Sequence, residues 1–186
     1  MKKLLALISG LVVSAIGIAA CATSRSGYET APYKVIRTEG AFEIRDYPEL
    51  KIATTSRDAD NSSFMRLFRY IDGGNAAKEK ISMTTPVFMM DGKMAFVVPE
   101  KHKKDTPAPA SPQVNVDTMK ARRVAVHRFS GSRTQELERQ ALMKLKAWMQ
   151  QNKLPEAGAP FSASYDPPWT PGFLRRNEVL VPISAP

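Results

Sequence analysis

The chain has 186 residues, 43% of them hydrophobic and 24% charged, and a formal net charge of +9. This length suits one domain, large enough to bury about 70% of the surface of its unfolded chain. One cysteine excludes an internal disulfide, and one cysteine with two histidines leaves little material for a Cys/His dyad or a histidine-based triad.

The first residues predict a secretory signal peptide. Lys2 and Lys3 give a positive start, and residues 4–20 are an uncharged, mostly apolar run that ends directly before Cys21. The run is near the lower length limit for a membrane-spanning helix, so an uncleaved anchor is the alternative. The serines and glycines within the run weigh against that alternative.

The end of this run, Ile18-Ala-Ala-Cys21, resembles a bacterial lipobox, in which the cysteine sulfur carries lipid and the peptide is cut just before it. We therefore predict a signal peptide over residues 1–20, lipidation of Cys21, and a tether over residues 21–32 that holds the domain at a membrane. Ala22, in place of aspartate, favours the periplasmic side of the outer membrane over the inner membrane. We expect an exported basic protein to meet anionic lipid or an acidic ligand, and not nucleic acid.

From residue 33 the pattern changes to short strands. Apolar Phe42 and Ile44 alternate with Glu43 and Arg45, as expected for a sheet with one buried face. In the first half of the chain, strands are predicted over residues 33–38, 42–47, 50–57, 87–90 and 94–98.

A helix is predicted between the third and fourth of these strands. Asn61–Ser63 supply candidate N-caps, and Asp72-Gly-Gly74 predicts the end of the helix. Phe64, Phe68 and Ile71 are expected to face inward, with Leu67 on the same apolar face. The side chains expected at the margin or outside are those of Arg66, Arg69 and Tyr70.

The second half repeats this order after a charged and proline-rich stretch, residues 100–112, which predicts a linker. A capping box at Ser132 and Gln135 starts a second helix, which runs to about Asn152. Strands are predicted over residues 113–117, 122–129, 161–165 and 178–183. We therefore predict one domain over residues 33–186 with two pseudo-repeats, 33–99 and 113–183. The predicted class is α+β: a pseudo-twofold, distorted antiparallel β-barrel or curved sheet with two packed helices.

Five motifs give this chain a family resemblance. They occur in the order Phe42–Pro48, Leu67–Asn75, Lys80–Pro86, Arg128–Gly131 and Tyr165–Glu178. In this order they resemble the SOUL/heme-binding protein family over residues 33–183. The resemblance implies a SOUL-like fold, shared more distantly with bacterial effector-binding domains. It also implies non-covalent binding of heme or another tetrapyrrole.

The resemblance further implies a shallow apolar cleft by the first helix and the late proline-rich loop. Arginine would contact the propionates, since its guanidinium group can bind carboxylates in a bidentate manner. Possible axial ligands to the iron are His127, Met65 and Met83, with weak or no ligation expected. The residues that would contact heme are Phe64, Leu67, Phe68, Arg69, Trp169 and Phe173. Trp169 and Phe173 would either plug the barrel's open end or wall a pocket there.

Two other classes of function stay open, and catalysis is not expected. The chain has no nucleophile elbow, phosphate-binding glycine loop or His-Glu-x-x-His zinc motif. One alternative is an effector- or cargo-binding module for a cationic aromatic small molecule, with Glu178 as its contact. The other is a structural envelope lipoprotein with no small ligand.

Overall fold

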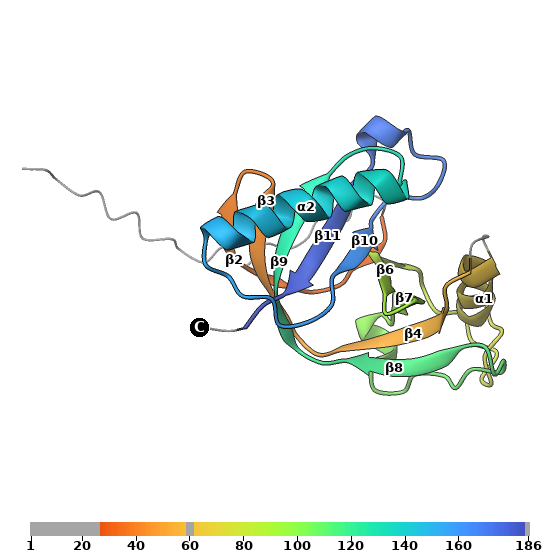
Figure 1. Ribbon diagram of the computed structural model, residues 1–186. Helices are drawn as coiled ribbons and strands as arrows, with labels where there is room; N and C mark the ends of the chain where they lie inside the picture. Colours follow the sequence, from red (N-terminus) through yellow and green to blue (C-terminus); the bar gives the residue numbers. More distant parts are fainter. Residues whose placement is uncertain (1–26, 59–61, 185–186) are drawn as a thin grey trace, which may run out of the picture.

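The computed structural model describes residues 27–58 and 62–184 and arranges them as a curled antiparallel sheet with two helices (Figure 1). This confirms the predicted α+β class and the curved sheet. The nine strands follow the order β2-β3-β9-β11-β10-β6-β7-β4-β8, and β1 pairs with β5 in a separate two-stranded sheet. The strands are β1 Glu29–Thr30, β2 Lys34–Glu39, β3 Phe42–Tyr47, β4 Leu50–Ser56, β5 Thr84–Thr85, β6 Val87–Met90, β7 Lys93–Val97, β8 Asn115–Met119, β9 Arg122–Phe129, β10 Phe161–Ser164 and β11 Asn177–Pro182. The helices are α1 Ser62–Ile71 and α2 Gln135–Gln151, with short 3-10 turns η1 Glu100–His102 and η2 Gly172–Leu174.

Apart from β2 at one edge, the strand order of the large sheet is symmetric about the pair β10 and β6. On one side lie β11, β9 and β3, and on the other lie β7, β4 and β8. Strands β3 and β8 are exchanged between the halves of the chain, because β3 pairs with β9 and β8 pairs with β4. The pair expected at 113–117 and 122–129 is therefore not a hairpin: β8 and β9 diverge to different partners after the short connection at Lys120-Ala121.

Three apolar clusters hold the sheet and the helices together. One fills the inside of the curl, one lies beneath α2, and one lies beneath α1. Because alternate residues of a strand point to opposite faces, most strands contribute to the inner cluster and also to one outer cluster. On β7, for example, Ala95 and Val97 point inward while Phe96 packs with α1.

Both helices end where the sequence predicts, but α2 starts with a different cap. Thr134, and not Ser132, accepts the hydrogen bond from the Leu137 backbone N–H, at 3.2 Å. Ser132 is taken up elsewhere, since its Oγ lies against Gly172 of the late loop. After the end of α1, a Cβ on Gly74 would lie 2.6 Å from the Arg69 carbonyl oxygen. This backbone conformation therefore requires glycine at position 74.

The predicted linker at residues 100–112 packs on the domain. The Tyr70 hydroxyl donates to the Pro107 carbonyl at 2.7 Å, and the Ala76 N–H donates to the Ala108 carbonyl at 2.8 Å. His102 is buried in η1 and lies 3.8 Å from a carboxylate oxygen of Glu79. The segment is therefore anchored along its length, because burial of its polar backbone requires such partners.

The predicted signal peptide, Cys21 and the first part of the tether lie outside the described residues. Among residues 27–58 and 62–184, no helix is long and apolar enough to cross a membrane.

Candidate functional site

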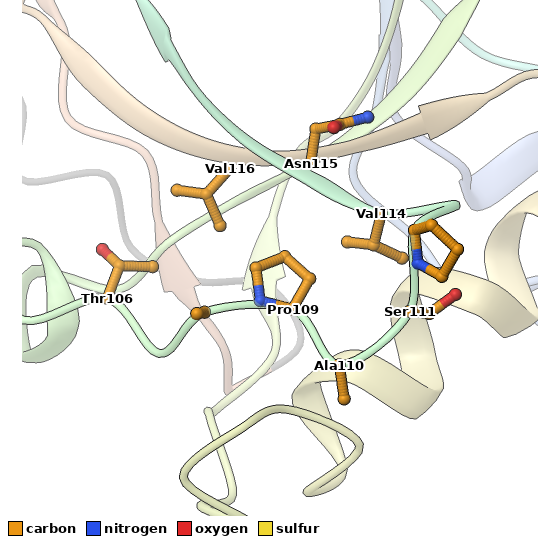
Figure 2. A pocket seen from close by; sticks show the side chains of 9 residues that line it. Thr106, Pro109, Ala110, Ser111, Val114, Asn115 and Val116 are labelled. Carbon is orange, nitrogen blue, oxygen red and sulfur yellow. The ribbon is translucent and has the colours of Figure 1, made fainter.

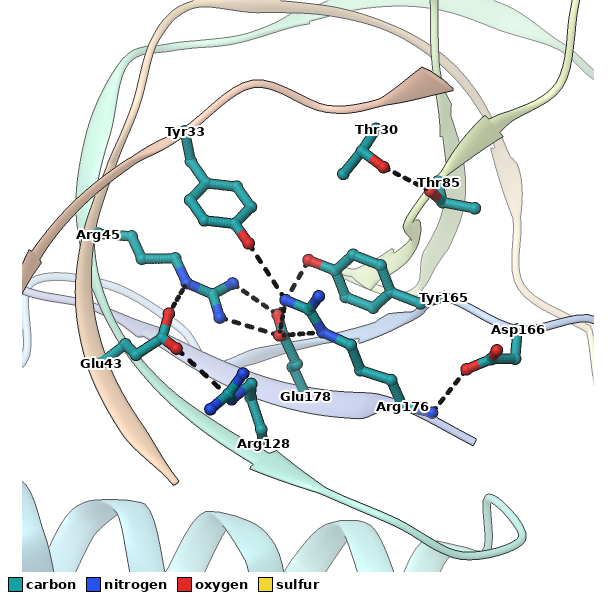
Figure 3. A network of polar contacts seen from close by, with 10 residues as sticks. All are labelled: Thr30, Tyr33, Glu43, Arg45, Thr85, Arg128, Tyr165, Asp166, Arg176 and Glu178. Carbon is teal, nitrogen blue, oxygen red and sulfur yellow. Dashed lines mark hydrogen bonds and ion pairs between the residues drawn. The ribbon is translucent and has the colours of Figure 1, made fainter. Parts of the chain in front are cut away.

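A carboxylate inside the curl is held by two arginines (Figure 3). Glu178, on β11, accepts two hydrogen bonds from Arg45 on β3, at 2.7 and 2.9 Å. Arg176 donates to the same carboxylate at 2.7 and 2.9 Å, and the Tyr165 hydroxyl donates to it at 3.0 Å. Glu178 and Arg45 are fully buried. The carboxylate thus has a full set of donors, all supplied by the chain itself.

A second layer of contacts fixes the two arginines. Arg45 donates to Glu43 at 2.6 Å, and its guanidinium lies 4.3 Å from the centre of the Tyr33 ring. The Arg176 guanidinium stacks 4.0 Å from the Tyr165 ring, and the Arg176 backbone N–H donates to Asp166. Stacking on aromatic faces and fork-like hydrogen bonding are typical uses of arginine, so neither position is equivalent to a lysine.

The electrostatics of this cluster favour the ionised pair. Burial alone would raise the pKa of Glu178, but Arg45 and Arg176 outweigh burial and lower that pKa. Burial would likewise lower the pKa of Arg45, but the Glu178 carboxylate raises it. The pKa of Tyr165 is raised well above its usual value by burial and by the adjacent Glu178. All of these groups therefore keep their ordinary charges at neutral pH.

The sequence singled out Glu178 only as the contact of an alternative ligand, and its full burial and its partner Arg45 were not predicted. The alternation in β3 suggested that Glu43 and Arg45 face water, and this is wrong: both are buried. Both faces of β3 are covered, because Ile44 packs beneath α2 while Arg45 points into the curl. The sequence did contain a possible signal for this pair. Arg45 lies within one predicted strand and Glu178 within another, and two opposite charges in strands can be buried together.

The first helix offers a different kind of surface. Leu67 is fully buried, Phe64 is half-buried, and Phe68, predicted to face inward, is 40% exposed. Phe64 stacks on Phe68 with ring centres 6.1 Å apart and packs edge-on against Phe96 at 5.3 Å. Tyr70, predicted to lie outside, is buried. The buried stripe follows Ser63, Leu67, Tyr70 and Ile71, which turns Phe68 toward solvent.

Arg66 and Arg69 lie on the other flank of α1. Arg66 is tied down by Asp58 at 2.6 Å and by the Ser56 carbonyl at 2.8 Å, whereas Arg69 is exposed. Both arginines line a small hollow of about 70 Å³ next to Gln113. A larger, open hollow of about 630 Å³ adjoins it (Figure 2). The larger hollow is lined by prolines and small or apolar residues, with no aromatic or charged side chain among them: Thr106, Ala108, Pro109, Ala110, Ser111, Pro112, Val114, Asn115 and Val116.

The late loop, residues 165–176, presents its aromatic side chains to solvent. Trp169 is 80% exposed and Phe173 is 77% exposed, so neither plugs the barrel. The space inside the curl is instead filled by the inner apolar cluster together with Glu178 and its partners. The loop itself is well braced: Arg175 donates to the carbonyls of Thr170 and Pro168, and the Gly131 N–H donates to the Gly172 carbonyl. A braced loop holds these rings outside at little further cost in entropy.

The three candidate iron ligands lie in different environments. His127 is buried beneath α2, where its ring stacks on Phe42 at 4.6 Å and its Nδ1 lies 3.1 Å from the Ala141 carbonyl. Burial lowers its pKa. Met83 is partly buried against the α1 cluster, while Met65 is exposed on α1. Of the three, Met65 alone is open to a ligand that lies on α1.

Within the described parts of the chain, no three His, Cys, Asp or Glu side chains are grouped so that they could hold a metal ion. The exposed side chains of α1 and the late loop include aromatic rings, methionine and arginine. Such a set suits a large apolar ligand with acidic groups better than a free metal ion.

Comparisons with known proteins identify the family of this chain. The family model described as SOUL heme-binding protein matches residues 28–182. Heme-binding protein 2 of Homo sapiens is 27% identical over 179 residues, which cover 87% of this chain and 86% of the relative. Heme-binding protein 2 of Mus musculus is also 27% identical, over 79% of this chain and 80% of the relative.

Solved structures share the fold at much lower identity. The EcmrR C-terminal domain superposes with a TM-score of 0.56 at 14% identity, over 78% of this chain and 98% of that domain. A structure described as a hydrolase from Listeria innocua gives a TM-score of 0.56 at 10% identity, over 80% of this chain and 94% of that one. At these identities the likeness shows a common fold and carries no activity across.

Proposed function

The chain belongs to the SOUL heme-binding protein family, and we propose that it binds heme or a related tetrapyrrole reversibly, without covalent attachment and without catalysis. We further propose that it does so at the cell envelope, as a lipoprotein anchored through Cys21 on the periplasmic side of the outer membrane. The family match supports the ligand class, and the lipobox-like end of the predicted signal peptide supports the location.

The observation that carries this proposal is the exposure of aromatic side chains on rigid supports. Trp169 and Phe173 stand out from a braced loop, and Phe68 stands out from α1. Isolated exposed apolar residues are ordinary, but two large aromatic rings held out of one braced loop indicate a binding surface. A flat apolar macrocycle would cover such rings and remove them from water.

The chain's own residues fit this group with little contribution from iron ligation. Bound heme would supply an iron centre, and Met65 is the accessible side chain that could reach it as a weak ligand. Coordination by His127 would require α2 to move off the sheet, because the imidazole is covered by Phe42 and Ala141. Affinity would therefore come from apolar burial and from arginine contacts to the propionates.

A cationic aromatic effector at Glu178 has less support. The carboxylate is fully buried, and Arg45, Arg176 and Tyr165 already occupy its oxygens. A cation would have to displace a buried arginine, and breaking such a pair costs about 3–5 kcal/mol.

A titration with hemin tests the proposal. A chain of residues 22–186 retains every described element, and we expect it to bind hemin in a saturable one-to-one manner. The double variant Trp169→Ala/Phe173→Ala should weaken binding roughly tenfold or more, because each ring loses the apolar area it buries against the ligand. Its stability should change by less than about 1 kcal/mol, because both rings are exposed in the free protein.

Met143→Ala is the matched control for this variant. Met143 is another exposed large apolar side chain, placed on α2. Its removal should leave hemin affinity unchanged. Equal losses in the control and in the loop variant would show nonspecific adsorption of hemin and contradict the proposed surface.

A further inference from the structure

The late loop, residues 165–176, projects from the sheet beyond the ends of β10 and β11 (Figure 1). It holds three large apolar side chains in water: those of Trp169 and Phe173, and that of Leu174, which is 49% exposed. Phe173 and Leu174 belong to the short turn η2, and the bracing of the loop described above keeps all three side chains outside. Tryptophan, phenylalanine and leucine on a projecting loop suit the interfacial region of a lipid bilayer, where amphipathic aromatic rings are enriched.

The chain enters the domain beside the base of this loop. Thr30 of β1 pairs with Thr85 of β5. Strand β5 is followed closely by β6, which pairs with β10, the strand that ends where the loop begins. At the other end of the loop, Arg176 donates to the Tyr33 hydroxyl at 3.2 Å (Figure 3). The first described residues and the late loop therefore lie at the same end of the molecule.

The anchor proposed at Cys21 would keep this end close to a membrane. A chain spans at most about 3.6 Å per residue, so Gly27 can lie no further than about 22 Å from Cys21, whatever the path between them. This reach is short beside the width of the domain, since a chain of this size has a radius of gyration of about 15 Å. In an anchored chain, the end that carries the late loop is therefore the end nearest to the bilayer.

The charge of the domain also favours a membrane surface. Removal of residues 1–20, which include two lysines, lowers the formal net charge from +9 to +7. Within the described part of the chain, Arg175 donates to two loop carbonyls and pairs with no carboxylate, so a cation directly follows Leu174. Asp166, the one acidic residue of the loop sequence, accepts from the Arg176 backbone N–H at 2.6 Å. Anionic lipid headgroups attract such a surface.

Resting on the envelope location in the proposed function, we propose that the late loop docks on the membrane that holds the anchor. Trp169, Phe173 and Leu174 enter the lipid interface, and Arg175 lies at the headgroups. The partner is a lipid bilayer that contains anionic lipid. The same rings are assigned to the tetrapyrrole, so the bound ligand and the bilayer exclude each other at the loop.

Vesicle binding by residues 22–186, produced without lipid on Cys21, tests this docking surface. The chain should float with vesicles of phosphatidylcholine and phosphatidylglycerol. Trp169→Ala/Phe173→Ala should weaken this binding roughly tenfold, because two rings are lost from the interface. Met143→Ala removes an exposed apolar side chain from α2 and is the matched control, which should bind vesicles like the unmodified chain.

Tryptophan fluorescence reports the contact directly. The chain has two tryptophans, and Trp148 is buried between α2 and the sheet, whereas Trp169 is exposed. Vesicles should therefore shift the emission of Trp169 to shorter wavelength, and brominated lipid should quench it. Trp169→Phe keeps a ring at this position, so it should retain most of the vesicle affinity while it loses both signals.

The outcomes separate this inference from the proposed function. The docking loop is wrong if the unmodified chain does not bind vesicles, if the double alanine variant binds them equally well, or if binding leaves Trp169 emission unchanged. In each of these cases, saturable hemin binding measured without vesicles would keep the proposed ligand. Vesicle binding through the loop without hemin binding would contradict the proposed ligand and keep the docking loop. Absence of lipid on Cys21 in the expressed full chain, measured by mass spectrometry, would contradict the proposed location.

Discussion

Glu178 and Arg45 join the two halves of the chain through their charges. They belong to β11 and β3, which are not adjacent strands but lie on either side of β9. Their pairing inside the curl requires that β9 keeps its register with both neighbours, since a slip by one residue would turn each side chain to the opposite face. The buried ion pair therefore forms only when these strands are in the correct register.

Replacement of Glu178 by glutamine should destabilise the fold. Arg45 would remain buried without its main counter-charge, a change that costs about 3 kcal/mol. The pKa of Glu178 is lowered from 4.5 in the folded state, so its contribution to stability is complete above pH 4.5 and is lost as the pH falls below that value. Urea unfolding between pH 3 and 7 should show a steeper loss of stability below about pH 4.5 in the unmodified chain than in Glu178→Gln. Parallel curves would contradict an ionised, paired Glu178.

Two buried tyrosines next to this carboxylate should respond differently to loss of the hydroxyl. Tyr165 donates to Glu178, and hydrogen bonds to charged groups contribute about 1.5–3 kcal/mol, so Tyr165→Phe should lower the unfolding free energy by that amount. The Tyr47 hydroxyl lies near Arg45 and Tyr165 but has no hydrogen-bond partner of suitable geometry in the described chain. Tyr47→Phe should therefore change stability by less than about 1 kcal/mol. Chemical denaturation of the two variants checks the order, and a larger loss for Tyr47→Phe would reverse it.

At the level of single elements, local patterns predicted most boundaries well. β3 and β9 match their predicted bounds, and α1 and α2 end where glycines or Asn152 predict. The orientation of side chains was less predictable. The apolar residues of α1 suggested that Phe68 is buried. In the folded chain Tyr70 is buried instead, and its hydroxyl donates to the Pro107 carbonyl, so the helix is rotated and Phe68 faces solvent.

The candidate site illustrates the same limit. The aromatic residues of α1 and of the late loop were recognised from their composition. The pairing of Arg45 with Glu178 and of Arg128 with Glu43 was not, because these residues come from three strands that only the folded sheet brings together. Nothing in the local sequence separates these arginines from the other basic residues of a strongly basic chain.

The turn after α1 offers a test at this scale. Gly74→Ala would place a Cβ 2.6 Å from the Arg69 carbonyl oxygen, so the turn or the end of α1 must shift. We expect a loss of roughly 1–3 kcal/mol in unfolding free energy, measured by urea denaturation. Unchanged stability would show that the helix end has more freedom than this turn allows.

At the scale of the molecule, the curled sheet has a packed inner face and an outer face that the two helices cover in part. The inside of the curl is packed and holds the Glu178 cluster, which closes the position where a buried ligand would otherwise lie. The outer face is covered by α1 on one half and by α2 on the other, and the central strands β10 and β6 lie between them. The proposed ligand binding is therefore expected on the outer surface, where Phe68, Trp169 and Phe173 are exposed.

The curved sheet could be predicted from the chain because strand patterns and turns are local. The exchange of β3 and β8 between the halves could not, because it depends on pairings between residues as far apart as Phe42 and His127. The same long-range pairing buries Arg45, which explains why the polar positions of β3 were misassigned.

The most direct test of the central claim is the absorbance of hemin titrated with residues 22–186, in parallel with His127→Ala. Our account predicts a saturable one-to-one Soret shift that is the same in both proteins, since His127 is covered by α2. An absorbance change no greater than that given by an unrelated basic protein would contradict heme binding. A shift that His127→Ala abolishes would keep heme binding but contradict the outer-surface site described above.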